Sequence, residues 1–158
     1  IGKTKTPSHF RTSLLRNRYL LGESPIKTAR EAPSILIVDD NVFNIYIAKN
    51  VVEILGYSAE TAVDGESAIQ KVKNMTQANN PPKLILMDCQ MPIMDGYEVT
   101  RILKDMMERK EIQNIPIVAL TANDKEFNLD RYKECGMTDF LSKPLVKEDL
   151  AKIISQIN

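Results

Sequence analysis

The sequence predicts an α/β fold built on a sheet of five parallel strands. From Ser34 onward, apolar runs rich in β-branched residues alternate five times with segments of helical periodicity, as in βαβ units. The runs lead into polar residues: Asp39 and Asp40 follow the first, Asp88 follows the third and Lys143 follows the fifth. Open parallel sheets bind ligands at this carboxyl edge, so we expect a site where these side chains meet.

The first two strand and helix pairs have well-marked boundaries. A strand is predicted at Ile35–Val38, and a helix from about Asn41 to Leu55 carries apolar residues at 3.6-residue spacing: Val42, Ile45, Ala48, Val52 and Leu55. Gly56 suits the C′ position after that helix. The second strand, Ser58–Ala62, is polar enough for a sheet edge, and Asp64 is the predicted N-cap of a helix that carries the apolar residues Ala68, Ile69 and Val72.

The remaining repeats include the most apolar and the most polar segments of the predicted domain. Leu84–Met87 is the most apolar run, which favours a central strand. The fourth helical segment, about Asp124–Glu134, is the most polar of the five, so weak anchoring is expected there. The other predicted elements are a helix from Tyr97 to Lys110, a strand at Ile115–Leu120, a strand at Asp139–Leu141 and a helix at Val146–Ile157.

Charge divides the 158 residues into two parts with opposite net charge. Residues 1–33 carry seven Lys/Arg against two Glu, whereas residues 34–158 carry fourteen against nineteen Asp/Glu. We therefore expect a basic N-terminal arm or linker at 1–33, ahead of an acidic domain at 34–158. Such asymmetry often indicates a segment with its own partner, although an arm that folds back on the acidic domain explains it equally well.

Composition argues against several classes of site and location. Cys89 and Cys135 lack the spacing of a metal site and are too few for a disulfide scaffold, which favours reduced thiols and a cytoplasmic location. No apolar stretch approaches the ~20 residues of a membrane helix, so no membrane contact is expected in this segment. No recognised DNA-binding motif is present and the domain is acidic, so nucleic acid is not an expected partner. Because the chain begins with Ile1, it is expected to come from a longer polypeptide, and whether that parent is membrane-anchored stays open.

The residues at the strand ends indicate a particular chemistry. Carboxylates packed together repel one another unless a cation lies among them. Hard oxygen ligands with few protein donors suit Mg²⁺, which keeps several of its waters and shares phosphate oxygens. Asp39, Asp40, Asp88 and Lys143 therefore predict phosphoryl transfer onto a carboxylate, with Mg²⁺ as the cofactor.

Four motifs in a fixed order identify a family. The chain closely resembles the receiver domain of two-component response regulators over residues 34–158, and its motifs are most similar to those of receivers attached to hybrid histidine kinases. This resemblance implies a doubly wound, flavodoxin-like sheet with strand order 2-1-3-4-5. The motifs are Val38-Asp39-Asp40-Asn41, the run from Met87 to Gly96 (MDCQMPIMDG), the run from Ala119 to Asn123 (ALTAN), and the run from Phe140 to Pro144 (FLSKP).

The resemblance also implies roles for single residues. Asp88 is implied as the phosphoacceptor, which attacks a phosphohistidine on a donor protein. Asp40 and Asp88 are implied as direct ligands of Mg²⁺ together with the backbone carbonyl of Gln90, while Asp39 reaches the metal mainly through water. Lys143 is implied to neutralise charge on the transferred phosphoryl group.

A conformational switch is implied as the output of phosphorylation. Thr121 is expected to donate its hydroxyl to a phosphoryl oxygen and to move together with Phe140, the aromatic position of the family switch. Phe140 lacks the hydroxyl of the tyrosine found in many receivers, so its ring packing would have to carry the signal. The implied partners are a histidine kinase or histidine-phosphotransfer protein as donor, and a downstream protein on the fourth helix, fifth strand and fifth helix.

Two alternatives stay open at this point. One is a phosphohydrolase with an aspartyl-phosphate intermediate, but such enzymes resemble a pattern with a second Asp two residues after the nucleophile, where this chain has Gln90. The other is a regulator that has lost phosphorylation, which the complete set of acidic, hydroxyl and lysine positions disfavours. As a receiver the chain would catalyse only its own phosphorylation and dephosphorylation, and a kinase activity would belong to the parent protein.

Overall fold

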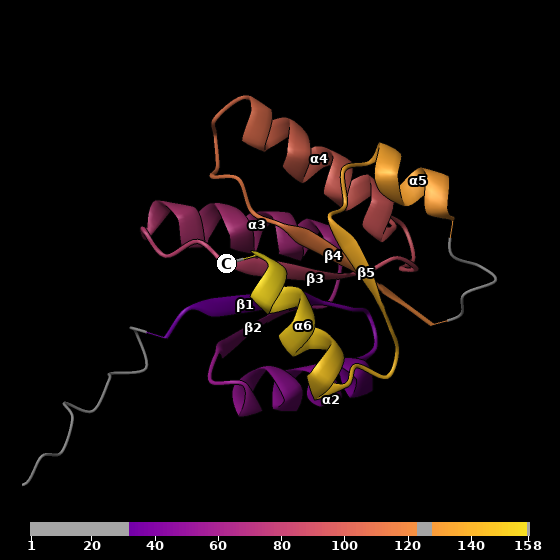
Figure 1. Cartoon of the computed structure of the whole chain (residues 1–158). Coiled ribbons are helices and arrows are strands. Elements are labelled where there is room, and N and C mark those ends of the chain that lie inside the picture. The colour runs from indigo at the N-terminus through magenta and orange to yellow at the C-terminus, as the bar shows by residue number, and fades with distance from the viewer. Residues whose placement is uncertain (1–31, 123–127, 158) are drawn as a thin grey trace, which may run out of the picture. The chain divides into compact units, whose positions relative to one another are not determined.

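The described part of the chain forms one five-stranded parallel sheet with helices on both faces (Figure 1). The computed structural model describes residues 32–122 and 128–157. The strand order is β2-β1-β3-β4-β5, which confirms the predicted topology. The elements are β1 (Ser34–Val38), α2 (Val42–Ile54), β2 (Ser58–Ala62), α3 (Gly65–Gln77), β3 (Leu84–Asp88), α4 (Gly96–Glu108), β4 (Ile117–Thr121), α5 (Leu129–Glu134), β5 (Asp139–Ser142) and α6 (Lys147–Ile157).

Alternating side chains of the central strands fill two separate cores. On one face Leu36 and Val38 of β1 pack with residues of α3 and α4, and on the other Ile35 and Ile37 pack with residues of α2 and α6. Every residue of β1, β3 and β4 is buried, as expected for parallel strands covered on both faces. This double burial fixes the strand register, because a shift by one residue would exchange the two faces.

The helix ends follow the local sequence signals. Asp64 is the N-cap of α3 and accepts a hydrogen bond from Ser67 N, in a capping box. Gly56 follows α2 with φ of +87°, the left-handed conformation that glycine adopts readily. Val42, the first apolar position of the predicted helical repeat, is 70% exposed. It is the first residue of α2, which starts just after the carboxyl end of β1.

Several predicted boundaries shift by one or two residues. β4 begins at Ile117 rather than Ile115, because Pro116 has no N–H to donate to a neighbouring strand. The fourth predicted helical segment is described only as α5, Leu129–Glu134, and residues 123–127 lie outside the described residues. No side chain of α5 is buried, in keeping with the weak anchoring predicted for this segment. Of the predicted arm, residues 1–31 also lie outside the described part.

The loop after β3 returns close to the strand that it leaves. Gly96 N donates to the carbonyl of Cys89 at 3.2 Å, which closes the loop as α4 begins. A Cβ atom at Gly96 would lie 2.0 Å from the backbone oxygen of Asp88, so only glycine fits there. The carboxyl end of β3 and the start of α4 are therefore held together by a contact that excludes any side chain.

The close approach at Gly96 leads to a stability prediction. We expect Gly96→Ala to lower the free energy of unfolding by about 1–3 kcal/mol, the usual range for overpacking, and to shift the amide resonances of Asp88 and Cys89. Gly56→Ala is the control, because its Cβ meets no atom within 4 Å and only the backbone strain of about 1 kcal/mol applies. Urea unfolding and amide spectra measure both effects. If both variants lost the same free energy of unfolding and the Asp88 amide resonance did not shift in Gly96→Ala, the steric argument would be contradicted.

Candidate active site

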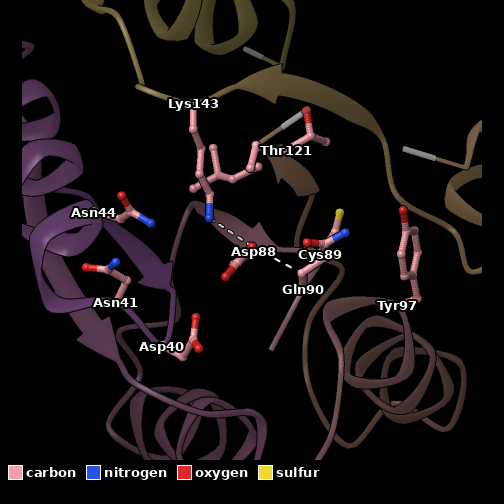
Figure 2. Close-up of a pocket in the computed structure, with 11 residues that line it drawn as sticks. Asp40, Asn41, Asn44, Asp88, Cys89, Gln90, Tyr97, Thr121 and Lys143 are labelled. Carbon is pink, nitrogen blue, oxygen red and sulfur yellow. Dashed lines mark hydrogen bonds and ion pairs between the residues drawn. The ribbon is translucent and has the colours of Figure 1, made fainter. Parts of the chain in front are cut away.

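A cavity of about 250 Å³ opens at the carboxyl edge of the sheet, as the sequence predicted. Figure 2 shows Lys143 entering this cavity from one side and Asp40 from the other, with Asp88 between them. The lining combines carboxylate, amide, hydroxyl, thiol and ammonium groups from the ends of several strands. The residues are Asp40, Asn41, Asn44, Asp88, Cys89, Gln90, Tyr97, Leu120, Thr121, Ala122 and Lys143.

Backbone hydrogen bonds beyond the strand ends hold the side chains of the cavity in place. Asp39 N donates to the carbonyl of Ala62 at 3.2 Å, and Cys89 N donates to that of Leu120 at 3.2 Å. Lys143 N donates to the carbonyl of Thr121 at 2.7 Å. The sheet pairing thus continues into the loops, so the acidic, hydroxyl and lysine positions are set by the backbone.

Lys143 bridges two buried carboxylates. Its Nζ lies 2.8 Å from Asp39 Oδ2 and 2.9 Å from Asp88 Oδ1. Asp39 is fully buried and Asp88 is 4% exposed. Burial by itself would lower the pKa of the Lys143 ammonium, but the hydrogen bonds to Asp39 and Asp88 outweigh it and raise that pKa above its usual range. The lysine therefore stays charged and compensates part of the charge on the acidic pair.

Asp88 is the carboxylate whose ionisation is most perturbed. Burial raises its pKa to about 6, although the hydrogen bond and the charge of Lys143 act in the opposite direction. The backbone N–H of Gln90 also donates to Asp88 Oδ1 at 3.2 Å. Asp88 is therefore a desolvated carboxylate that ionises near neutral pH and has one face open to the cavity.

The three carboxylates can hold a divalent cation. One oxygen each of Asp39, Asp40 and Asp88 lies within 4.8 Å of the other two, and Asp40 is the exposed member of the group. With Lys143 charged, the cluster has a net charge of −2 (three carboxylates and one ammonium), which one divalent ion neutralises. Few protein oxygens and an open side suit Mg²⁺, which retains several waters.

Asp39 is oriented by two residues of the following turn. Its Oδ1 accepts from Asn41 N at 2.8 Å and from Asn44 Nδ2 at 3.3 Å, which leaves Oδ2 to Lys143. Asn41 is also the N-cap of α2. Asn44 was not among the site residues predicted from the sequence, although its position three residues after an N-cap, one helical turn along, is the signal that could have found it.

The two expected switch residues occupy different environments. Thr121 is buried at the end of β4 and lines the cavity, and among the described residues its Oγ1 has no hydrogen-bond partner. Phe140 is 38% exposed and does not line this cavity. Its ring instead meets Tyr132 of α5 edge to face, with centroids 5.7 Å apart. Thr121 thus presents an unused donor to the site, while Phe140 contacts the least anchored helix.

Cys89 and Tyr97 line the cavity without offering a charged group. Burial raises the pKa of the Cys89 thiol to about 11, so the thiol is protonated at neutral pH. Burial likewise raises the pKa of Tyr97 to about 12. A protonated buried thiol is a poor nucleophile, which favours a packing role for Cys89 beside Asp88.

The described helices give no candidate for a membrane span, because none of them is both long enough and apolar enough to cross a bilayer.

Comparisons with known proteins identify the family. The family model of the response regulator receiver domain matches residues 35–155. The hybrid signal transduction protein dokA of Dictyostelium discoideum is 38% identical over 130 residues, which cover 82% of this chain but 7% of dokA. The sensor protein EvgS of Escherichia coli is 37% identical over 86% of this chain and 10% of its own length. This chain therefore spans a small fraction of such relatives.

A shorter relative and solved structures agree with this assignment. The two-component response regulator ORR41 of Oryza sativa is 35% identical over 81% of this chain and 96% of its own length. The receiver domain of the Arabidopsis thaliana histidine kinase CKI1, complexed with Mg²⁺, has a TM-score of 0.71 and 29% identity over 80% of this chain and 92% of that one. The receiver domain of the sensor histidine kinase PA1611 from Pseudomonas aeruginosa, with magnesium in its active site cleft, has a TM-score of 0.66 and 30% identity, and covers 79% and 96% of the two chains. This chain therefore belongs to the response regulator receiver domain family of two-component systems.

Proposed function

We propose that this domain accepts a phosphoryl group on Asp88 from a phosphohistidine donor in a two-component phosphorelay. The observation that carries the proposal is the position of Asp88, a buried carboxylate at the end of β3 with Lys143 Nζ at 2.9 Å and an open cavity beside it. Asp39 lies on the far side of the same lysine and Asp40 is exposed at the mouth. A nucleophilic carboxylate, an ammonium group and an acidic cluster suit transfer between two anionic partners.

The reaction joins Asp88 to phosphorus. A carboxylate oxygen of Asp88 forms a bond to phosphorus while the bond between phosphorus and the donor imidazole nitrogen breaks, and that electron pair stays on the nitrogen. The three remaining phosphoryl oxygens carry the negative charge. Lys143 is positioned to neutralise part of it, and the Thr121 hydroxyl, which has no other partner among the described residues, can donate to one oxygen.

Mg²⁺ fits the remaining acidic groups. Asp40 and Asp88 would hold it with the backbone carbonyl of Gln90, and Asp39 would contact it mainly through water. When bound, the ion would neutralise charge on the phosphoryl oxygens and on the carboxylates. The carboxylate spacing of 4.8 Å or less and the net charge of the cluster support this choice.

A protein donor is supported by exposed apolar side chains at the start of α2, the helix that follows Asp40 and Asn41 of the cavity lining. Phe43 and Tyr46 on the first turns of α2 are each about two-thirds exposed or more, and Val42 beside them is exposed as well. The N-cap of their helix, Asn41, lines the cavity. Exposed apolar clusters of this kind mark contact surfaces for other proteins. We propose a histidine kinase or a histidine-phosphotransfer protein as the donor, and a longer hybrid histidine kinase as the parent.

The output surface is proposed on α5, β5 and α6. Helix α5 has no buried side chain, and its Tyr132 packs against the core only partly buried. At the surface, Arg131 Nη2 pairs with Asp95 Oδ2 at 2.9 Å, and its guanidinium carbon lies 4.5 Å from the centroid of the Tyr97 ring. The contact between Tyr132 and Phe140 adds a second attachment. Few buried contacts mean a small free-energy cost for displacing the helix, which suits a switch.

The alternative, a phosphohydrolase with an aspartyl-phosphate intermediate, gains no support from the site. The position where such enzymes would place a second carboxylate, two residues after Asp88, holds Gln90. The matched relatives are signalling proteins in their printed names.

Replacing Asp88 tests the proposed nucleophile. With acetyl phosphate and Mg²⁺, the wild-type chain should gain one phosphoryl group in intact-mass spectra, and Asp88→Asn should gain none because an amide oxygen is a poor nucleophile. Asp95→Asn is the matched control, since Asn preserves the N-cap that Asp95 provides to Glu98 N at 2.9 Å. Equal labelling of Asp88→Asn would reject the assignment.

The pKa of Asp88 predicts how Mg²⁺ affinity depends on pH. Protons compete with the metal for the carboxylate, and in metal-free protein the pKa of Asp88 is about 6. Affinity should therefore be nearly constant above this pKa and fall about tenfold for each pH unit below it. Calorimetric titrations between pH 5 and pH 8 measure this. In Asp88→Asn the decrease near pH 6 should disappear, and a wild-type affinity that does not change from pH 7 to pH 5 would contradict the prediction.

Hydrogen exchange tests the output surface. Addition of beryllofluoride, a stable phosphoryl mimic, with Mg²⁺ should change amide exchange in 128–142 more than in α2, because α5 has no buried side chain while α2 buries Ala48 and Val52. Asp88→Asn with the same additions controls for effects away from the site. Equal changes in both segments would place the output elsewhere.

A further inference from the structure

Ile93 has a backbone conformation that its side chain disfavours. Its φ is +71°, in the left-handed region where a β-branched residue is a genuine outlier. Among the described residues, the other non-glycine positions with positive φ are Asn79 and Lys110, which both lie just past the end of a helix. Asn tolerates this region and Lys is unbranched, so Ile93 is the most strained of the three.

The side chain of Ile93 is not buried, so no packing compensates for the backbone strain. It is fully exposed, more than any other large apolar residue in the described part of the chain. An isoleucine in water gains no burial, and a glycine or asparagine would hold the same backbone more easily. Strain of this kind persists in proteins mainly at functional sites.

Ile93 is five positions after Asp88, the proposed phosphoacceptor. It lies in the loop between Asp88 and α4, which is closed by the hydrogen bond from Gly96 N to the Cys89 carbonyl and folded by that from Met94 N to the Pro92 carbonyl at 2.8 Å. A second cavity, beside the first and sharing Cys89, Gln90 and Tyr97 with it, is lined by Pro92 and Asp95 on either side of Ile93. Ile93 is four positions after Cys89 in the chain, so the two are within roughly 15 Å.

We propose that Ile93 is a docking and specificity residue for the protein that donates the phosphoryl group. The inference rests on the proposed function, because a donor that reaches Asp88 must cover the mouth of its cavity. An interface of ordinary size, about 800 Å² on each partner, extends far enough from Asp88 to include Ile93. Its apolar side chain would be buried in that interface. The burial would then contribute hydrophobic free energy to binding, which the exposed side chain does not contribute to folding. The apolar residues at the start of α2 indicate that the donor presents an apolar surface of its own.

The test compares two donors and two kinds of variant. Ile93→Asn relieves the strain and removes the apolar contact, whereas Ile93→Met keeps an apolar side chain without β-branching. Lys110→Gly is the matched control, because it relieves a positive φ of +58° after the end of α4. The donors are acetyl phosphate and a phosphorylated histidine-phosphotransfer protein.

We expect Ile93→Asn and Lys110→Gly both to raise the urea midpoint of unfolding. With acetyl phosphate, all variants should be phosphorylated at the wild-type rate within about twofold. With the phosphotransfer protein, Ile93→Asn should lose about tenfold in the second-order rate constant, as for an interface residue whose truncation has a clear effect but falls short of a hot spot. Ile93→Met and Lys110→Gly should retain the wild-type rate.

The possible failures are distinguishable. If neither donor loads the wild-type chain, the proposed function itself fails. Wild-type transfer from the protein donor to Ile93→Asn would overturn the docking role alone. Equal loss with both donors would show that Ile93 shapes the loop rather than the interface, and a lowered urea midpoint in Ile93→Asn would show that the side chain stabilises the free domain. Either result would overturn the inference.

Discussion

The site depends on one ammonium group placed between two buried carboxylates. Asp39 and Asp88 come from neighbouring strands, and without Lys143 their charges would repel each other in a region of low dielectric constant. The lysine follows β5, at the other edge of the sheet from β2. Because all three residues sit where parallel strands end, the ion-pair geometry requires the register of the whole sheet, and any change in that register would separate the charges.

This charge compensation is incomplete. One lysine and three carboxylates together carry a net charge of −2, which a divalent cation would neutralise. Asp40 is the exposed carboxylate of the three. A fully neutralised cluster would have little affinity for a metal ion, while a cluster without Lys143 would be costly to bury in the metal-free protein. The raised pKa of Asp88 reflects the same balance, since burial outweighs the attraction of the lysine there.

Most of the fold and the acidic site could be predicted from sequence because both depend on local patterns. Buried strands read as apolar runs, and the residues that follow them must converge at one edge of a parallel sheet, so Asp40, Asp88 and Lys143 could be grouped from their positions along the chain. The pairing of Arg131 with Asp95 could not, since it joins side chains 36 residues apart through two surface elements. The exposure of Val42 could not be predicted either, because helical periodicity assigns a face to each residue but does not say where the sheet beneath it ends.

The features that add least to folding stability lie on the outer surfaces of the site rather than in the core. Val42 is apolar but exposed, Ile93 is β-branched at positive φ, and α5 is a helix with no buried side chain. Each lowers the stability of the free domain or fails to increase it, and each lies beside the cavity or on the proposed output surface. The core can be close-packed and the register fixed because the sheet carries the stability. Because the sheet supplies this stability, neighbouring segments can keep residues that are suboptimal for folding. Such residues can still be stabilised when a binding partner covers them.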